Sequence, residues 1–175
     1  MTIRERIRSL SSFSIFRSMK AADLQKFAKS VDEETYPAGH MMLDVNSVAD
    51  KVYLIDRGAV KVSRSTKFGD ETTLIMLGHG DVVGELAVLD GRFRSARATC
   101  AEETLVFSIS KAGFEKLLKK DRAVSLNLLR ELAGRIRNSN DNIVKRLEEQ
   151  RLLVESRLDK LHRLESSPCL VLFLL

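Results

Sequence analysis

The 175-residue sequence has little cysteine, little proline and no tryptophan, and it contains no long uninterrupted apolar run. Its two cysteines, Cys100 and Cys169, cannot form a disulfide framework, so the composition fits a reducing compartment. The longest apolar stretch, residues 169–175, is far shorter than the ~20 residues that cross a membrane. The first ten residues carry arginines with no apolar segment after them, which argues against a signal peptide. We therefore expect a cytoplasmic protein without a membrane span.

The sequence also lacks the motifs of the common enzyme classes. His40, His79 and His162 stand far apart, without the spacing of metal ligands. No serine nucleophile motif and no phosphate-binding P-loop motif is present. The glycine pattern over residues 78–84 is one residue off a dinucleotide-binding fingerprint and does not open a long helix. We therefore expect a protein that is not an enzyme and that holds neither a cofactor nor a metal ion.

The overall composition is that of a folded chain. Hydrophobic residues make up 44% of the sequence and charged residues 30%, which excludes wholesale disorder. Lysine and arginine number 29 against 24 aspartate and glutamate residues, a net charge of +5 that suits any anionic partner.

Segments of different character follow one another along the chain. Residues 1–34 are expected to be a helical segment, because apolar residues recur there at spacings near three and four. Residues 35–120 consist mostly of short apolar runs separated by glycines, which is typical of strands. Within them, residues 84–91 read as a helical turn and residues 110–120 as a short helix. The pattern predicts a mainly β fold with flanking α-helices, arranged as a barrel or a sandwich.

Residues 121–166 have the pattern of one long helix, with no proline and a single glycine, Gly134. Apolar or small side chains recur there in steps of three and four, with one slip near residue 158, which is a heptad seam. The seam comprises Leu129, Leu132, Ile136, Ser139, Asn140, Ile143, Leu147, Gln150, Val154, Leu158 and Leu161. Because such a helix would run about 60 Å, we expect a homodimer through it. The alternative is a lone helix packed on its own domain.

The apolar tail, residues 167–175, could dock into a groove, lengthen the dimer contact or result from a frameshift. The sequence leaves these alternatives open.

Residues 80–99 combine groups that suit a phosphorylated sugar. A helical turn flanked by glycines presents free backbone N–H groups, which attract an anion. Arg94 can donate two charge-assisted hydrogen bonds to a phosphate, and Ser95 adds a hydroxyl group. Glu85 is an acceptor suited to a ribose hydroxyl.

Two runs in this stretch, residues 84–87 (GELA) and 94–96 (RSA), resemble the phosphate-binding cassette of the cyclic-nucleotide-binding domain. That domain is shared by the catabolite activator family and the regulatory subunits of cyclic-AMP-dependent protein kinase. The resemblance covers about residues 10–147. It implies a double-stranded β-helix, or jelly roll, forming a nucleotide-binding barrel that is followed by a long C-terminal dimerisation helix. We call residues 84–96 the cassette.

Mild departures from the family pattern accompany this resemblance. Phe93 stands where a proline is common, Arg97 where a small residue is common, and Val83 replaces a frequent aromatic residue or isoleucine. A purely structural interpretation is also open, in which Arg94 forms a surface ion pair and Glu85 is a charge at a helix N-terminus. The joint spacing of the two residues favours ligand binding.

The resemblance implies a role for each part of the cassette. Glu85 is expected to accept a hydrogen bond from the ribose 2′-hydroxyl, while Arg94 and Ser95 hold the cyclic phosphate. Backbone groups of the same segment are expected to complete this part of the site: Gly84, Leu86, Ala87 and Ala96.

The resemblance also implies contacts to the base. The residues expected to line it are Val62, Leu74 and Leu86. Ser139 and Asn140 align with a polar pair on the long helix that touches the adenine in the activator family, although they could instead serve only to fix the register of a dimer. Arg135, one turn earlier, is expected to reach Glu85.

The expected function is that of a dimeric cyclic-nucleotide sensor that transmits ligand occupancy through the long helix to an unidentified protein partner. Cyclic AMP is the expected ligand and cyclic GMP the alternative, because a hydroxyl at Ser95 suits either. A DNA-reading domain would need about 60–70 further residues with a recognition helix after Glu165, so no direct DNA binding is expected. Two alternatives remain: the sensor half of a truncated activator-type transcription factor, and a scaffold regulated by cyclic GMP.

Overall fold

The computed structural model describes residues 1–67 and 69–165, so the predicted apolar tail lies outside the described residues. The chain divides into two compact units, Met1–Leu129 and Arg130–Leu175. Its helices are α1 (Ile3–Leu10), the 3-10 helix η1 (Ser14–Phe16), α2 (Ala21–Ala28), α3 (Glu85–Leu89), α4 (Lys111–Lys120) and α5 (Arg122–Glu165). Its strands are β1 (Asp32–Tyr36), β2 (Met41–Leu43), β3 (Lys51–Arg57), β4 (Val60–Ser65), β5 (Glu71–Leu77), β6 (Val82–Val83), β7 (Arg97–Cys100) and β8 (Thr104–Ser110).

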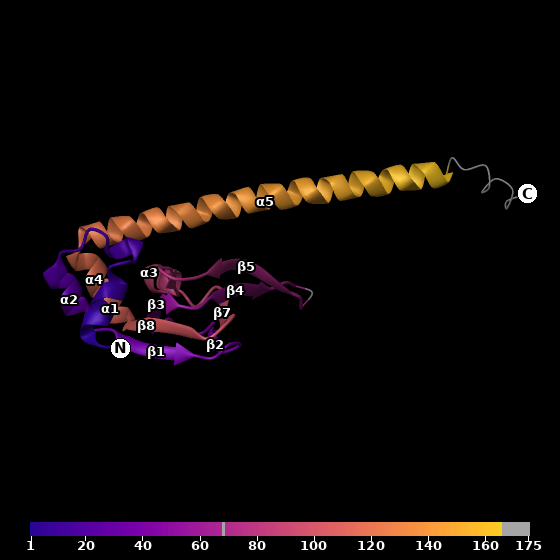
Figure 1. The fold of residues 1–175 in the computed structure, drawn as a ribbon. Helices are drawn as coiled ribbons and strands as arrows, with labels where there is room; N and C mark the ends of the chain where they lie inside the picture. The colour runs from indigo at the N-terminus through magenta and orange to yellow at the C-terminus, as the bar shows by residue number, and fades with distance from the viewer. Residues whose placement is uncertain (68, 166–175) are drawn as a thin grey trace, which may run out of the picture. The chain divides into compact units, whose positions relative to one another are not determined.

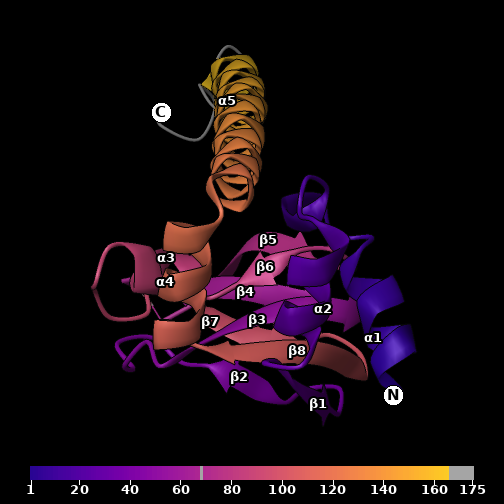
Figure 2. The ribbon, with the colours of Figure 1, turned by 90° about the vertical axis from the view of Figure 1, so that its left-hand side faces the viewer.

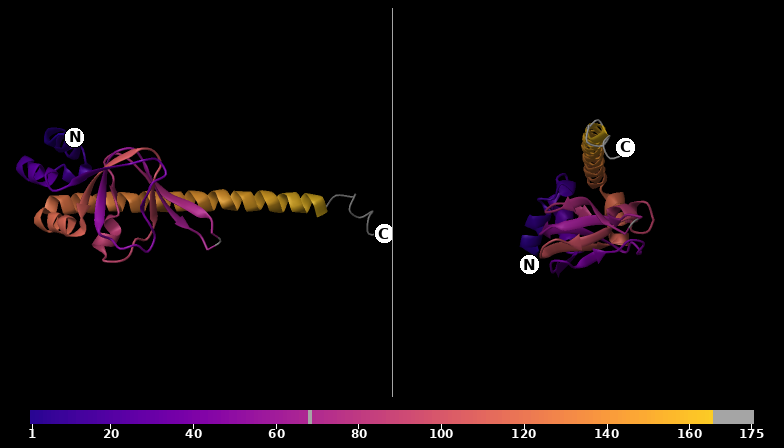
Figure 3. Two further views of the ribbon diagram at one scale, coloured as in Figure 1. Left: turned by 90° about the horizontal axis from the view of Figure 1, so that it is seen from below. Right: turned by 90° about the vertical axis from the view of Figure 1, so that its right-hand side faces the viewer.

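The strands form a sandwich of two antiparallel sheets, which Figures 1 and 3 show from three sides. One sheet has the strand order β1-β8-β3-β6 and the other the order β2-β7-β4-β5. The expected mainly β fold with flanking helices is confirmed. The expected barrel is corrected in one respect: among the described residues the edge strands of the two sheets do not pair with each other, so no closed barrel forms.

Strands β8 and β3 are the two central strands of their sheet, and both of their faces are covered. Every residue of β8 except Ser110 is buried, and so are Val52 to Asp56 of β3. On the inner face, Ile55 and Val106 belong to the core between the two sheets. A continuous apolar run is what a strand needs when apolar side chains cover it on both sides.

The N-terminal segment covers the outer face of the β1-β8-β3-β6 sheet. The ring of Phe13, just before η1, lies 6.5 Å from that of Phe107 on β8, and both side chains are fully buried. Helices α1 to α4 gather at one end of the sheets in Figure 1, and in Figure 2 α1 and α2 lie on one side of this end and α3 and α4 on the other. The segment contains three short helices, and the first strand begins at Asp32, earlier than the expected start at residue 35.

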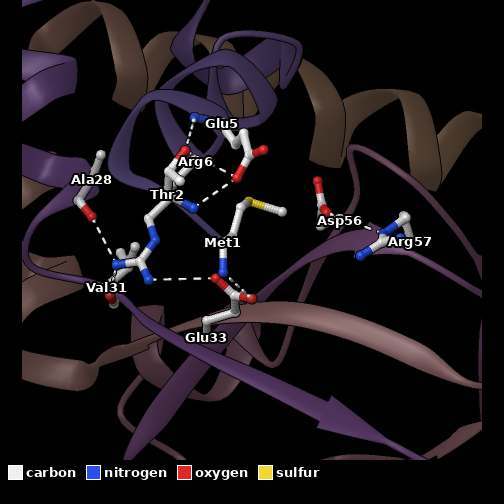
Figure 4. Close-up of polar contacts among 9 residues, drawn as sticks. All are labelled: Met1, Thr2, Glu5, Arg6, Ala28, Val31, Glu33, Asp56 and Arg57. Atoms are coloured by element: carbon white, nitrogen blue, oxygen red, sulfur yellow. Dashed lines mark hydrogen bonds and ion pairs between the residues drawn. The ribbon is translucent and has the colours of Figure 1, made fainter.

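Polar contacts fasten α1 to the start of β1, as Figure 4 shows. Thr2 and Glu5 form a capping box at the N-terminus of α1. Arg6 donates from Nη1 to the carbonyl groups of Ala28 and Val31, at 3.1 and 3.0 Å. These bonds satisfy the carbonyl group of Ala28, the last residue of α2, and that of Val31 just after the helix, which have no helical partner.

The two C-terminal helices begin as the sequence predicts. Ser110 caps α4 by accepting a hydrogen bond from the amide of Gly113, and Phe114 is buried. In the first turns of α5, Val124 and Leu128 are buried within the first unit. The prediction of one long helix from about residue 121 is confirmed.

Farther along, in the second unit, α5 carries exposed apolar side chains at the heptad positions. Their exposed fractions lie between 54 and 62%. They are Ile136, Ile143, Leu147, Val154, Leu158 and Leu161. None of the described helices is both long enough and apolar enough to cross a membrane.

Candidate functional site

The cassette begins with a backbone turn that only glycine adopts easily. Gly84 joins β6 to α3 with a φ of +84°, in the left-handed region. A Cβ atom at this position would lie 2.6 Å from Arg94 Nη1 and 3.1 Å from Leu43 Cδ1. Gly84 therefore allows both the turn and the close approach of the arginine, and the predicted helical turn at residues 84–91 is confirmed as α3.

Arg94 lies buried beneath this turn, with only 3% of its surface exposed. Nη1 donates to the carbonyl of Gly84 at 2.5 Å, and Nη2 donates to the carbonyl of Lys51 at 2.6 Å. Nη2 also lies 3.8 Å from a carboxylate oxygen of Asp50. A guanidinium group has five N–H donors, so the two carbonyl groups leave donors available. Among the described residues, the buried Nε has no hydrogen-bond partner.

The backbone of Arg94 is held from the other side by the loop after β2. The amide of Arg94 donates to the carbonyl of Ser47 at 3.0 Å, and its carbonyl accepts from the amide of Asn46 at 2.9 Å. Asn46 has a φ of +63°, a conformation that asparagine tolerates better than most residues. The arginine is thus fixed through both its backbone and its side chain.

Glu85 is the second buried charged residue of the cassette, with 4% of its surface exposed. Burial lowers the pKa of Arg94, and the carboxyl groups of Asp50 and Glu85 act in the opposite direction. The two predicted ligand-binding residues are therefore close enough to interact electrostatically. Because arginine stays protonated in proteins, the site combines a fixed positive charge with a carboxyl group, which suits an anion that carries a hydroxyl group.

The remaining predicted residues of the first unit differ in their exposure. Ser95 is exposed and Ala96 half-buried, while Ala87 is buried. Leu74 and Leu86, two of the expected base-lining residues, are 54% and 51% exposed. The third, Val62, is partly buried and packs against the core between the two sheets.

The other predicted contacts lie on α5. Arg135, Ser139 and Asn140 belong to the second unit, which begins at Arg130. Their part in ligand binding stays a prediction.

Sequence reasoning missed the groups that hold Arg94 in place. The carbonyl of Lys51 carries no sequence signal, because every residue has a carbonyl group. The position of Asp50 next to Arg94 depends on how β3 meets the cassette. Within residues 1–67 and 69–165 no cluster of three histidine, cysteine, aspartate or glutamate residues could hold a metal ion.

The family model of the cyclic nucleotide-binding domain matches residues 33–121, which include all strands but the first residue of β1, the whole cassette and α4. The chain belongs to the cyclic nucleotide-binding domain family. The matched range includes Gly84, Glu85 and Arg94.

Two curated relatives and one solved structure place this cyclic nucleotide-binding domain among known proteins. A CRP-like cAMP-activated global transcriptional regulator of Mycobacterium tuberculosis is 28% identical over 134 residues, which are 77% of this chain and 60% of the relative. A cAMP-dependent protein kinase regulatory subunit of Eremothecium gossypii is 30% identical over 109 residues, 62% of this chain and 23% of the relative. The chain thus spans less than two thirds of either relative.

A cyclic nucleotide-binding domain from Methylobacillus flagellatus has the same fold. Its structure superposes with a TM-score of 0.71 at 22% identity, covering 82% of this chain and 83% of the other. At this level of identity the similarity concerns the fold alone.

Proposed function

We propose that this protein is a regulatory sensor that binds a cyclic nucleotide, with cyclic AMP as the ligand, at the cassette. The observation that carries the proposal is the pair of buried charged residues, Arg94 and Glu85. Among the described residues, the buried Nε of Arg94 has no hydrogen-bond partner. A buried donor without a partner is costly, and a phosphate oxygen would satisfy it. Cyclic AMP is proposed because it appears in the names of both relatives described above. Cyclic GMP stays the alternative, because a further relative, 31% identical over 114 residues, is a cGMP-dependent protein kinase of Caenorhabditis briggsae.

The proposed roles follow the geometry of the cassette. Arg94 holds the cyclic phosphate through donors that Gly84 and Lys51 leave available. Glu85 accepts from the ribose 2′-hydroxyl, and exposed Ser95 adds a hydroxyl group to the phosphate contact. The site binds and releases its ligand, and no residue in it is proposed to perform chemistry.

Isothermal titration calorimetry with cyclic AMP tests this site. A hydrogen bond to a charged group contributes about 1.5–3 kcal/mol, so Arg94→Ala should weaken binding about 10- to 150-fold if one such bond is lost, and more if two are lost. Arg94→Lys keeps the positive charge but cannot donate two parallel hydrogen bonds as a guanidinium group does. Its affinity for cyclic AMP should therefore also be lower than that of the wild type. Arg92→Ala is the matched control, since Arg92 is an exposed arginine two positions away. Unchanged affinity in a folded Arg94→Ala protein would exclude the proposed site.

We further propose that α5 forms a homodimer. The exposed apolar side chains at heptad positions support this, because exposing them in water is unfavourable and a second copy would bury them. Replacing both Ile143 and Leu147 with Asp would place charges in the interface and should yield a monomer in light scattering. Replacing the exposed Glu148 with Asp is the control. A monomeric wild-type protein at micromolar concentration would contradict this proposal.

The output of the sensor is proposed to pass through α5 to a protein partner. A ligand shifts a conformational equilibrium only by its differential affinity for the two states, typically about 1–3 kcal/mol. Hydrogen exchange should therefore show protection by cyclic AMP in residues 84–97 and also in residues 135–150. Protection confined to residues 84–97 would show that α5 only dimerises the protein.

A further inference from the structure

Arg97 is the first residue of β7, directly after the cassette, and its side chain bridges two carboxylates. Nε and Nη2 both lie 3.2 Å from Asp44 Oδ1, in the loop after β2. Nη1 lies 3.9 Å from Glu71 Oε1, at the start of β5. A planar guanidinium group can serve two carboxylates at once, which a small residue at this position cannot. One side chain therefore joins the loop after β2 to the β4–β5 hairpin.

On the hairpin side of Arg97, two further donors hold the carboxylate of Glu71. Ser63 Oγ, on a fully buried residue of β4, donates to Oε1 at 2.6 Å, and Lys61 Nζ donates to Oε2 at 3.2 Å. The hydrogen bond from Ser63 and then that from Lys61 lower the pKa of Glu71 below its ordinary value. Glu71 thus carries its charge at neutral pH and ties β4 to β5 at the point where Arg97 reaches them.

On the other side of Arg97, its contact with Asp44 connects it to the loop that holds the backbone of Arg94. Asp44 Oδ1 also accepts from the amide of Val45 at 2.9 Å, and the carbonyl of Asp44 accepts from Ser47 Oγ at 2.6 Å. Through Asn46 and Ser47, the same loop makes both backbone hydrogen bonds to Arg94. A continuous series of polar contacts therefore runs from the hairpin through Arg97 to the arginine of the cassette.

The β4–β5 hairpin carries two of the predicted base-lining residues, Val62 and Leu74. In Figures 1 and 3 it projects past the ends of the neighbouring strands. The pairing shifts register between Val62 and Ser63, close to the contact with Glu71. The hydrogen bond from Ser63 to Glu71 therefore lies at this irregularity in the pairing.

We propose that Arg97 is a positioning residue of the cyclic nucleotide site, one that sets the β4–β5 hairpin, and with it the base-lining residues, relative to Arg94. This inference rests on the proposed function, because it assigns the hairpin to the base of the same ligand. Arg97 itself lies on the outer face of its sheet, since its neighbour Ala98 belongs to the core between the sheets. It therefore acts on the base through the hairpin and not by contact.

The test compares cyclic AMP with ribose 3′,5′-cyclic phosphate, which has the same phosphate and ribose but no base. The base-free ligand is measured by competition with cyclic AMP. Because partly exposed ion pairs contribute little individually, Arg97→Ala should weaken cyclic AMP binding only about three- to tenfold, and it should leave the affinity for the base-free ligand unchanged. Arg97→Lys, which keeps one charged contact, should lose less. Arg64→Ala is the control and should leave both affinities unchanged. Arg64 is an exposed arginine on the same hairpin, and it has no ion-pair partner among the described residues.

Two results would overturn the role in base positioning. One is an equal loss for both ligands, which would place the effect at the phosphate or in general stability. The other is no loss for either ligand. A double-mutant cycle adds a second criterion: Arg97→Ala and Glu71→Ala together should cost no more affinity than one of them alone.

Hydrogen exchange on the ligand-free protein separates this inference from the proposed function. In Arg97→Ala, amides of residues 61–76 should exchange faster, while those of α4 should not change. Unchanged exchange in the hairpin would show that Arg97 does not fix the position of the hairpin, and the inference would be overturned. A wild-type protein that binds no cyclic nucleotide would instead overturn the proposed function and with it the role of Arg97 in ligand binding, even if the hairpin loosens.

Discussion

Replacing Gly84 with Ala tests how far the cassette depends on one missing side chain. Two effects add at this position. The φ of +84° requires the left-handed conformation, which costs an L-residue about 1–2 kcal/mol. In addition, the new Cβ atom would lie 2.6 Å from Arg94 Nη1, closer than a carbon and a nitrogen atom can approach. Since the contact is with the end of a side chain, we expect the guanidinium group to move and the backbone to stay.

The two effects have different consequences. The backbone cost lowers stability, and for a chain of this size about 1 kcal/mol shifts Tm by about 2–4 °C. Displacing the guanidinium group breaks its 2.5 Å hydrogen bond to the carbonyl of Gly84 and misaligns the donors intended for the phosphate. Losing one charged hydrogen bond of about 1.5–3 kcal/mol should weaken cyclic AMP binding about 10- to 150-fold.

Gly80→Ala is the matched control. Gly80 has a φ of +88°, but a Cβ atom there would meet nothing within 4 Å. Thermal unfolding should show a similar loss of Tm for both variants, whereas calorimetry should show a loss of affinity only for Gly84→Ala. If both variants bind cyclic AMP equally well, the close approach of Gly84 and Arg94 does not position the arginine and the reasoning is refuted.

Two further predictions concern the sandwich itself. Burial raises the pKa of Glu34, but hydrogen bonds from Lys51, Ser108 and Tyr36 outweigh it and lower the pKa below 4.5. The stabilisation is therefore present above pH 4.5 and is lost as the pH falls through the lower pKa of the folded state. Glu34→Gln should make the free energy of unfolding, measured with urea, fall less steeply toward acid pH. An unchanged acid dependence would contradict this. Phe107→Ala, which removes a fully buried ring, should lower the free energy of unfolding by about 3–5 kcal/mol in urea denaturation, and a loss below about 1 kcal/mol would contradict the packing described here.

Much of the local structure could be predicted because it depends on neighbours in the sequence. The helical turn of α3, the capping serine of α4 and the length of α5 all follow from spacing, glycines and the absence of proline. The start of β1 at Asp32 could not be predicted, since three acidic residues in succession give no apolar alternation. Pairing with β8 determines this strand, and such pairing depends on residues far away in the chain.

The candidate site likewise has features that local sequence predicts and features that depend on residues far apart in the chain. The sequence alone predicts which side chains would meet a ligand, because Glu85 and Arg94 stand at a fixed spacing within one short segment, and this prediction is not yet tested. Two features became known from the folded structure: carbonyl groups of Gly84 and Lys51 hold Arg94, and Arg97 reaches both Asp44 and Glu71. Backbone carbonyl groups are the same for every residue, and a pair of opposite charges can be matched with many partners. Which of them meet depends on how the two sheets pack, and that is a property of the folded chain as a whole.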